Sequence, residues 1–258
     1  MCIRDRECLA AVRKVLRLGA AVVKVCASGG VLSDLDDPRH QQFSDEELRA
    51  IVEEAARAER LVAAHCHGKA GIMAALKAGA KTIEHGTYLD EEAADRMIEV
   101  GAILCPTLTM KFELGPHVAK ESGLPQIMIE KARVVDAHVR EGVRIAYRKG
   151  VTFALGTDIG VSSDSGPAHW GGNGAEFAYM VEEVGMTPLE AIRAGTANGP
   201  LTLGAQAPKS GQLRAGYVAD VIAVTEDPLK RIQVLSEAER ILKVWKDGTL
   251  VVDRAAAT

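Results

Sequence analysis

Short apolar runs alternate with segments of helical periodicity along the first two hundred residues of the chain. The run at 20–26 is apolar on both faces, as a strand covered on both sides would be. We expect strands at 20–26, 61–66, 81–85, 102–106 and 151–157. Helices are expected between and after them, at 7–18, 44–60, 68–77, 90–101, 125–149 and 187–197. This order predicts an α/β fold with a parallel sheet and right-handed crossovers.

The pattern changes after Gly204. Segments 212–224 and 241–253 look like β structure, and Asp247-Gly248 is a strong hairpin signal between two strands. We therefore expect a small β unit at the end of the chain rather than further βα repeats.

Composition excludes several classes of protein. Of the 258 residues 47% are hydrophobic, no apolar run is long enough to span a bilayer, and 1–6 contains no signal-peptide core. A net charge of −4 with 4% aromatic residues argues against nucleic-acid binding. Five scattered cysteines suit reduced thiols, so we expect a cytoplasmic protein without membrane or nucleic-acid partners, and a homo-oligomer stays open.

Four potential metal ligands follow or end the apolar runs: Lys24, His65, His85 and Asp158. Each has an ordinary explanation, because the lysine could reach solvent from an edge strand, a histidine could be structural, and the aspartate could be a turn former. In parallel α/β folds, however, chemistry gathers at the carboxyl ends of the strands. Their repetition at successive strands therefore favours a metal site.

The tripeptide His65-Cys66-His67 indicates which of its side chains can share a metal site. Neighbours in a strand point to opposite faces, so His65 and His67 can share a site that excludes Cys66. The chain has no C-x-x-C pair, which argues against a structural zinc site. A thiol hydrolase built on Cys66 or Cys105 with His85 is a weaker alternative.

These motifs together resemble the amidohydrolase superfamily, nearest to its imidazolonepropionase-like and prolidase-like metal-dependent hydrolases. The resemblance rests on Val-Val-Lys24-Val, Ala-His65-Cys-His67-Gly, Thr-Ile-Glu84-His85-Gly and Ala-Leu-Gly-Thr157-Asp158. Segments 186–192 and 196–198 resemble the last barrel helix of that family, and 211–221 with 244–248 resemble its closing β-sandwich.

The resemblance implies a (β/α)₈ TIM barrel holding two divalent metal ions, usually zinc, and hydrolysis of a C–N bond by a metal-bridging hydroxide. It implies that Lys24 is a carboxylated, metal-bridging lysine and that His65 and His85 bind one metal. It also implies that Asp158 binds the other metal and carries protons, while His67 either contacts the substrate or lies just outside the metal ligands. From such a position His67 could stabilise the developing oxyanion. His169 and Asn173 are further candidates for substrate contact, in a loop that could equally be an ordinary exposed one.

One departure from the family pattern limits these expectations. The family's first barrel strand ends in His-x-His, whereas the single His-x-His here, at 65–67, follows Lys24 and therefore matches the fifth strand. We expect a partial TIM barrel, strands 4 to 8, over 7–204, and a C-terminal portion of a small β-sandwich over 205–258. The chain would then be an N-terminally truncated and weakly active fragment.

Three functions stay open at this stage. The first is a metal-dependent hydrolase of a small molecule such as a dipeptide or an N-acyl amino acid. The second is a cyclic-amide hydrolase of the imidazolone type on the same scaffold. The third is a non-catalytic α/β fragment in which these residues are idle.

Overall fold

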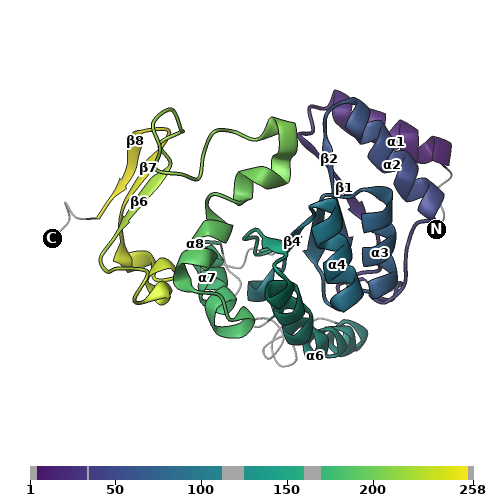
Figure 1. Ribbon diagram of the computed structural model, residues 1–258. Helices are drawn as coiled ribbons and strands as arrows, with labels where there is room; N and C mark the ends of the chain where they lie inside the picture. The colour runs from purple at the N-terminus through teal and green to yellow at the C-terminus, as the bar shows by residue number, and fades with distance from the viewer. Residues whose placement is uncertain (1–4, 34, 112–124, 160–169, 255–258) are drawn as a thin grey trace.

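The computed structural model describes residues 5–33, 35–111, 125–159 and 170–254, and contains two sheets (Figure 1). The first sheet is parallel throughout, in the order β1-β2-β3-β4-β5. Its strands are β1 Val22–Cys26, β2 Leu61–Cys66, β3 Thr82–His85, β4 Ile103–Cys105 and β5 Thr152–Phe153. The predicted α/β fold with a parallel sheet is confirmed.

In the described part of the chain, one helix precedes the sheet and four helices connect its strands. They are α1 Asp5–Arg17, α2 Asp45–Arg57, α3 Lys69–Ala78, α4 Glu91–Val100 and α6 Gln126–Lys149. Two more follow the sheet, α7 Ala175–Tyr179, which continues into a π-helical turn at Met180–Val184, and α8 Pro188–Gly195. Short 3₁₀ turns lie at Gly172–Gly174, Gly199–Gln206, Ile232–Leu235 and Ala238–Arg240.

Local sequence signals explain where several helices begin. The Ser44 side chain accepts from the backbone N–H of Glu47 while the Glu47 carboxylate accepts from the Ser44 N–H, so the capping box forms as predicted. Thr187 and Glu190 form a second capping box at α8.

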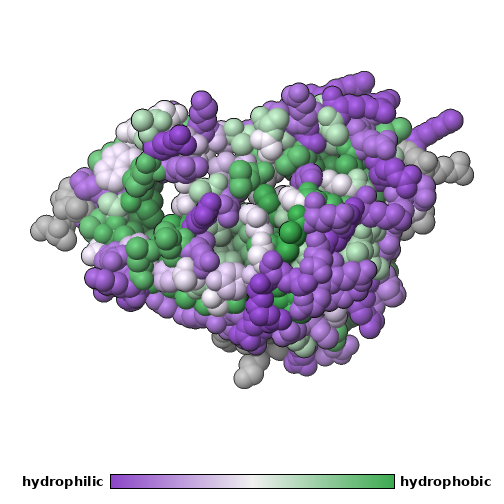
Figure 2. All heavy atoms as spheres, in the orientation of Figure 1, coloured by the Kyte–Doolittle hydropathy of each residue, from purple (hydrophilic) through white to green (hydrophobic). Residues whose placement is uncertain are grey.

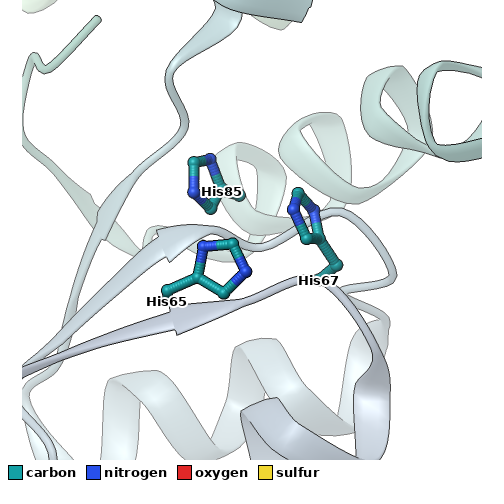
Figure 3. Close-up of side chains that lie close together, drawn as sticks. All are labelled: His65, His67 and His85. Atoms are coloured by element: carbon teal, nitrogen blue, oxygen red, sulfur yellow. The ribbon is translucent and has the colours of Figure 1, made fainter. Parts of the chain in front are cut away.

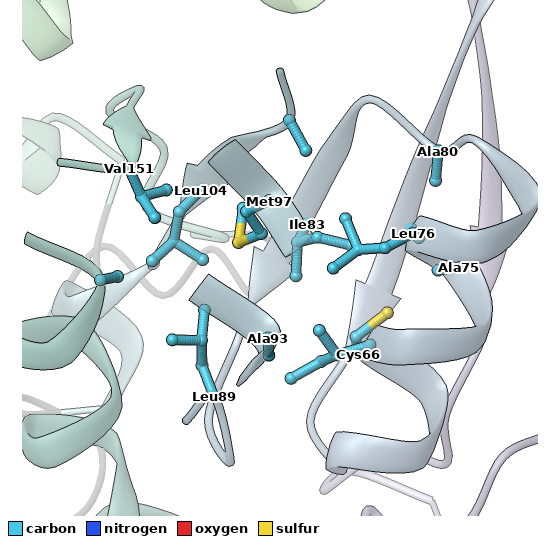
Figure 4. Close-up of a cluster of buried hydrophobic side chains, with 14 of the residues drawn as sticks. Cys66, Ala75, Leu76, Ala80, Ile83, Leu89, Ala93, Met97, Leu104 and Val151 are labelled. Carbon is cyan, nitrogen blue, oxygen red and sulfur yellow. The ribbon is translucent and has the colours of Figure 1, made fainter. Parts of the chain in front are cut away.

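The main core lies between one face of the parallel sheet and the helices (Figure 4). Alternate strand residues point to this face, and the strand side chains Cys66, Ile83 and Leu104 are fully buried there. Leu76 of α3 and Met97 of α4 meet them from the helices. Full burial of such a side chain stabilises the fold by ~1.5–3 kcal/mol.

The other face of β1 differs from expectation. We expected both faces of 20–26 to be covered, yet Val23 and Val25 are buried whereas Lys24 and Cys26 are exposed. The reason is topological, because β1 is an outer strand of its sheet and Lys24 points away from the helices. Lys24 therefore reaches solvent without the penalty of a buried cation.

Two expected strands are shorter than predicted. β5 pairs with β4 through only two residues, and 154–157 continue without strand pairing. In the tail, 212–220 form bends and one turn at 215–216 without strand pairing, and strand β6 begins only at Val221. Gly211 and Gly216 adopt positive φ there, which interrupts an extended strand.

The second sheet is antiparallel and three-stranded. It contains β6 Val221–Val224, β7 Ile241–Lys246 and β8 Thr249–Asp253. Asp247 and Gly248 form the predicted hairpin turn, both with positive φ. None of the residues in these strands is buried, and hydrophobic residues show near this sheet in Figure 2. Within the described ranges, no helix has the length and apolar character needed to cross a membrane.

Candidate metal centre and active site

A cavity of about 520 Å³ opens at the carboxyl ends of the parallel strands. Among the residues that the sequence singled out, His65, His67, His85 and Asp158 line it. Lys24 does not line the cavity, but its charge acts on His65, His85 and Asp158. Asn173 lies nearby and donates from Nδ2 to Thr157 Oγ1 at 3.0 Å, whereas His169 lies outside the described residues.

Three imidazole rings form the centre of this site (Figure 3). Each pair of ring centroids among His65, His67 and His85 is 4.7 Å apart. One potential ligand atom from each ring lies within 4.8 Å of the others. Imidazole nitrogens are common ligands of zinc, so this donor set fits a divalent metal ion.

The strand ends adopt an unusual backbone that directs these side chains. Strict alternation would place His85 on the same face as Ile83, toward the helices and away from His65. His85 instead has a φ of 73°, in the left-handed region, and its ring lies beside that of His65. Thr107 and Asp158, with φ of 54° and 55°, share this conformation and line the same cavity. Such backbone strain concentrates at functional sites.

Hydrogen bonds determine which nitrogen of two rings is free. His65 Nε2 lies 3.2 Å from the Gly29 carbonyl, which can only accept, so Nε2 carries the proton and Nδ1 keeps its lone pair. The Thr107 hydroxyl donates to the Pro106 carbonyl at 2.7 Å and therefore accepts from His85 Nδ1 at 2.6 Å. No hydrogen bond within the described residues engages His85 Nε2, and a partner on the opposite nitrogen is the usual arrangement for a metal-binding histidine.

Burial sets the protonation of the site. It lowers the pKa of His65 and lowers the pKa of His67 and of His85 well below the ordinary value. The three rings are therefore neutral at physiological pH, as metal binding requires. Partial desolvation raises the pKa of Asp158, while the charge of Lys24 opposes that shift. Asp158 is thus suited to accept a proton.

The structure adds polar residues that sequence reasoning missed. Lys111 lines the cavity, and burial lowers its pKa to about 7 against the attraction of Asp136. Glu176 of α7 is fully buried, which raises its pKa to about 7. Lys111 and Thr107 follow the fourth strand, so the strand-end rule could have identified them, but no local signal marks Glu176.

The thiol alternative is not supported. Cys66 is fully buried on the helix side of β2, as strand alternation predicts, and Cys105 is also buried. Burial raises the pKa of both thiols far above the ordinary value. Neither forms the thiolate that nucleophilic catalysis needs.

Apolar side chains form the wall of the cavity opposite the strand ends. They come from the loop after β1 (Val31, Leu32 and Phe43), from the segment after β4 (Met110) and from α6 (Val135). Lys131 of α6 holds the loop after β1 against the helix. Its Nζ donates to the Ser33 carbonyl at 2.6 Å and forms an ion pair with Asp36 at 3.4 Å. The cavity thus offers a polar floor and an apolar wall, which suits a ligand with both kinds of group.

Comparison with known proteins gives consistent matches. Residues 2–251 match the model of the amidohydrolase family. Ochratoxinase of Aspergillus niger is 47% identical over 252 residues, which cover 97% of this chain and 50% of ochratoxinase. Among solved structures, a Xaa-Pro dipeptidase with methionine bound in its active site superposes with a TM-score of 0.85 at 36% identity. A prolidase complexed with N-methylphosphonate-L-proline superposes with a TM-score of 0.89 at 34% identity.

The coverage of these relatives is unequal. The match to the dipeptidase covers 96% of this chain and 58% of the dipeptidase. The match to the prolidase covers 97% of this chain and 59% of the prolidase. The chain therefore spans little more than half the length of the proteins it resembles.

Proposed function

Because this chain belongs to the amidohydrolase family, we propose that it hydrolyses the C–N bond of an amide or peptide. The substrate is a small molecule, either a dipeptide or an N-acyl amino acid. The observation that carries the proposal is the convergence of His65, His85 and Asp158 on one cavity, from the ends of β2 and β3 and from the segment that follows β5. The names of the relatives, ochratoxinase, Xaa-Pro dipeptidase and prolidase, support the substrate class.

The residues of the site fit divalent metal ions, and we assign zinc. His65 through Nδ1 and His85 through Nε2 have the free lone pairs for one metal, and Asp158 supplies a carboxylate for a second. Lys24, once carboxylated, would join the two ions as an anionic ligand. The bound metals would supply the acidity that makes water nucleophilic at neutral pH and would polarise the scissile carbonyl.

The remaining chemistry belongs to the side chains. Asp158 takes the proton of the attacking water and passes it to the leaving nitrogen, for which its raised pKa is suited. His67 donates a hydrogen bond to the oxyanion that develops on the carbonyl oxygen. Asn173, in the 3₁₀ turn Gly172–Gly174, contacts the substrate, and His169, which lies outside the described residues, is the second candidate for this role.

We also propose that this chain holds only part of the ligand set. Its parallel strands correspond to strands 4 to 8 of a (β/α)₈ barrel over 7–204, and 205–258 form a portion of a small β-sandwich. The five-strand sheet and the half-length match to the relatives support this correspondence. Zinc binding by the chain alone is then weak and its turnover slow. Two tightly held zinc ions per chain in metal analysis would contradict this part of the proposal.

Product analysis by mass spectrometry tests the activity. The zinc-loaded chain is incubated with a dipeptide, an N-acyl amino acid and a cyclic amide, beside Asp158→Asn, His85→Ala and the control His40→Ala. We expect zinc-dependent cleavage of the first two substrates, its loss in Asp158→Asn, and less retained zinc in His85→Ala. His40 is exposed and does not line the cavity, so its variant should match the wild type.

Three results would speak against the proposal. Cleavage of the cyclic amide alone would favour an imidazolone-type hydrolase. Equal cleavage by the wild type and Asp158→Asn would favour a chain whose site residues are idle. The same conclusion would follow if no substrate were cleaved above the level of Asp158→Asn.

A further inference from the structure

A buried hydrogen-bond chain leads from Lys111 to His67. Lys111 Nζ lies 3.1 Å from Thr87 Oγ1, and Thr87 Oγ1 lies 2.8 Å from His67 Nδ1. Thr87 is fully buried, Lys111 is 8% exposed and His67 is 4% exposed. The three residues come from different places in the chain; Lys111 and His67 line the cavity, and Thr87 bridges them.

The donors and acceptors in this chain have a definite direction. A lysine ammonium has three protons and no lone pair, so Lys111 donates and the Thr87 oxygen accepts. Within the described part of the protein, the Thr87 side chain makes only these two hydrogen bonds. Its hydroxyl proton therefore has one acceptor, His67 Nδ1. A neutral imidazole that accepts at Nδ1 carries its own proton at Nε2.

We propose that Lys111, acting through Thr87, is a positioning residue that holds His67 in the Nε2–H form, as a hydrogen-bond donor toward the cavity. This inference rests on the proposed function and deepens it, because a ring protonated at Nε2 donates to an oxyanion but cannot bind metal through that nitrogen. His67 is thereby set apart from its neighbour His85, whose Nδ1 donates to Thr107 and whose Nε2 is free.

Burial lowers the pKa of Lys111 to about 7, and three nearby carboxyl groups partly offset that shift in favour of the ammonium. Asp136, Glu176 and Asp158 all exert an attractive potential on its ammonium. The ammonium thus lies near negative charge and keeps its hydrogen bond to Thr87.

Long-range ¹H–¹⁵N correlation spectra of the purified chain, labelled with ¹⁵N-histidine, report the tautomer directly. The spectra are taken below the pKa of Lys111, and the His67 signals are identified by their loss in His67→Asn. Lys111→Met and Thr87→Val each remove one link, whereas Thr87→Ser keeps the hydroxyl. Lys131→Met is the matched control, since Lys131 borders the same region but bonds to Ser33 and Asp36.

We expect the wild type to show His67 as Nε2–H. Loss of one hydrogen bond should shift its tautomer ratio about fivefold toward Nδ1–H in Lys111→Met and Thr87→Val. Thr87→Ser and Lys131→Met should keep the wild-type pattern. An Nδ1–H pattern in the wild type, or an unchanged ratio in Lys111→Met, would overturn the inference. The spectra are recorded without substrate and do not depend on hydrolysis. Failure of the hydrolysis assay would therefore contradict the proposed function, whereas the tautomer of His67 would still be measured independently.

Discussion

Replacement of Glu176 by alanine should destabilise the fold and loosen the site together. The Glu176 carboxylate accepts from the backbone N–H groups of Leu108 and Thr109, at 2.8 and 2.7 Å, and from the Thr109 hydroxyl at 2.7 Å. These residues directly follow Thr107, which positions the ring of His85. One side chain of α7 thus holds the first helical residues that follow β4.

The size of the effect follows from the groups left without partners. Alanine leaves two buried backbone N–H groups unpaired, and each such group costs ~1–3 kcal/mol, so a loss of ~2–6 kcal/mol is expected. The carboxylate also has a penalty of its own, because burial raises the pKa of Glu176 from 4.5 to about 7. Because the folded-state pKa of Glu176 is raised, its protonated form stabilises the fold by ~3 kcal/mol at pH values below the unfolded pKa of 4.5. This stabilisation is lost as the pH rises to about 7. Alanine removes this penalty, so the loss should be larger at acidic pH than at pH values above 7.

Urea unfolding of the metal-free chain at about pH 5.5 and about pH 8 measures both quantities. Glu92→Ala is the control, because Glu92 is exposed and, among the residues the structure describes, pairs only with Lys69 at the surface. Its unfolding free energy should change by no more than ~1 kcal/mol at either pH. A loss below ~1 kcal/mol for Glu176→Ala at the lower pH, or a loss that grows as pH rises, would refute the reasoning.

Two further substitutions test the strand ends. Thr107→Val removes the acceptor for His85 Nδ1, so zinc affinity measured with a competing chelator should fall about tenfold, and an unchanged affinity would contradict the tautomer assignment. At Gly68 a Cβ atom would lie 2.3 Å from the Arg39 carbonyl oxygen, so Gly68→Ala should lower the unfolding free energy by at least ~2 kcal/mol. Gly199→Ala is the control, because a Cβ there meets nothing within 4 Å; equal loss in both variants would refute the steric argument.

The sequence predicted the parts of the fold that depend on neighbouring residues. The Ser44 capping box and the hairpin at Asp247-Gly248 are short-range devices, and both formed as expected. The early end of β5 was not predicted, since pairing with β4 stops after two residues although the apolar run continues. The length of a strand depends on its neighbour in the sheet as well as on its own residues.

The site, like the fold, was predictable where it depends on residues close together in the sequence, and unpredictable where it depends on contacts that folding creates. His65 and His85 were recognisable because each stands at the end of an apolar strand, and they do meet. Their protonated nitrogens could not be inferred, because these depend on the Gly29 carbonyl and on Thr107, which are brought near by folding. Glu176 carries no motif, and its role depends on a contact across 67 residues of chain.

The left-handed backbone at His85, Thr107 and Asp158 lowers the stability of the fold while it directs these side chains to the proposed active site. A residue with a Cβ atom loses ~1–2 kcal/mol in this conformation, and glycine would not. Laboratory selection for heat resistance alone should therefore favour glycine at these three strand ends, and each gain would remove a side chain from the cavity. Glycine variants at these positions would have a higher melting temperature and a lower hydrolytic activity. A screen for thermostable variants of this protein should therefore measure both the melting temperature and the activity.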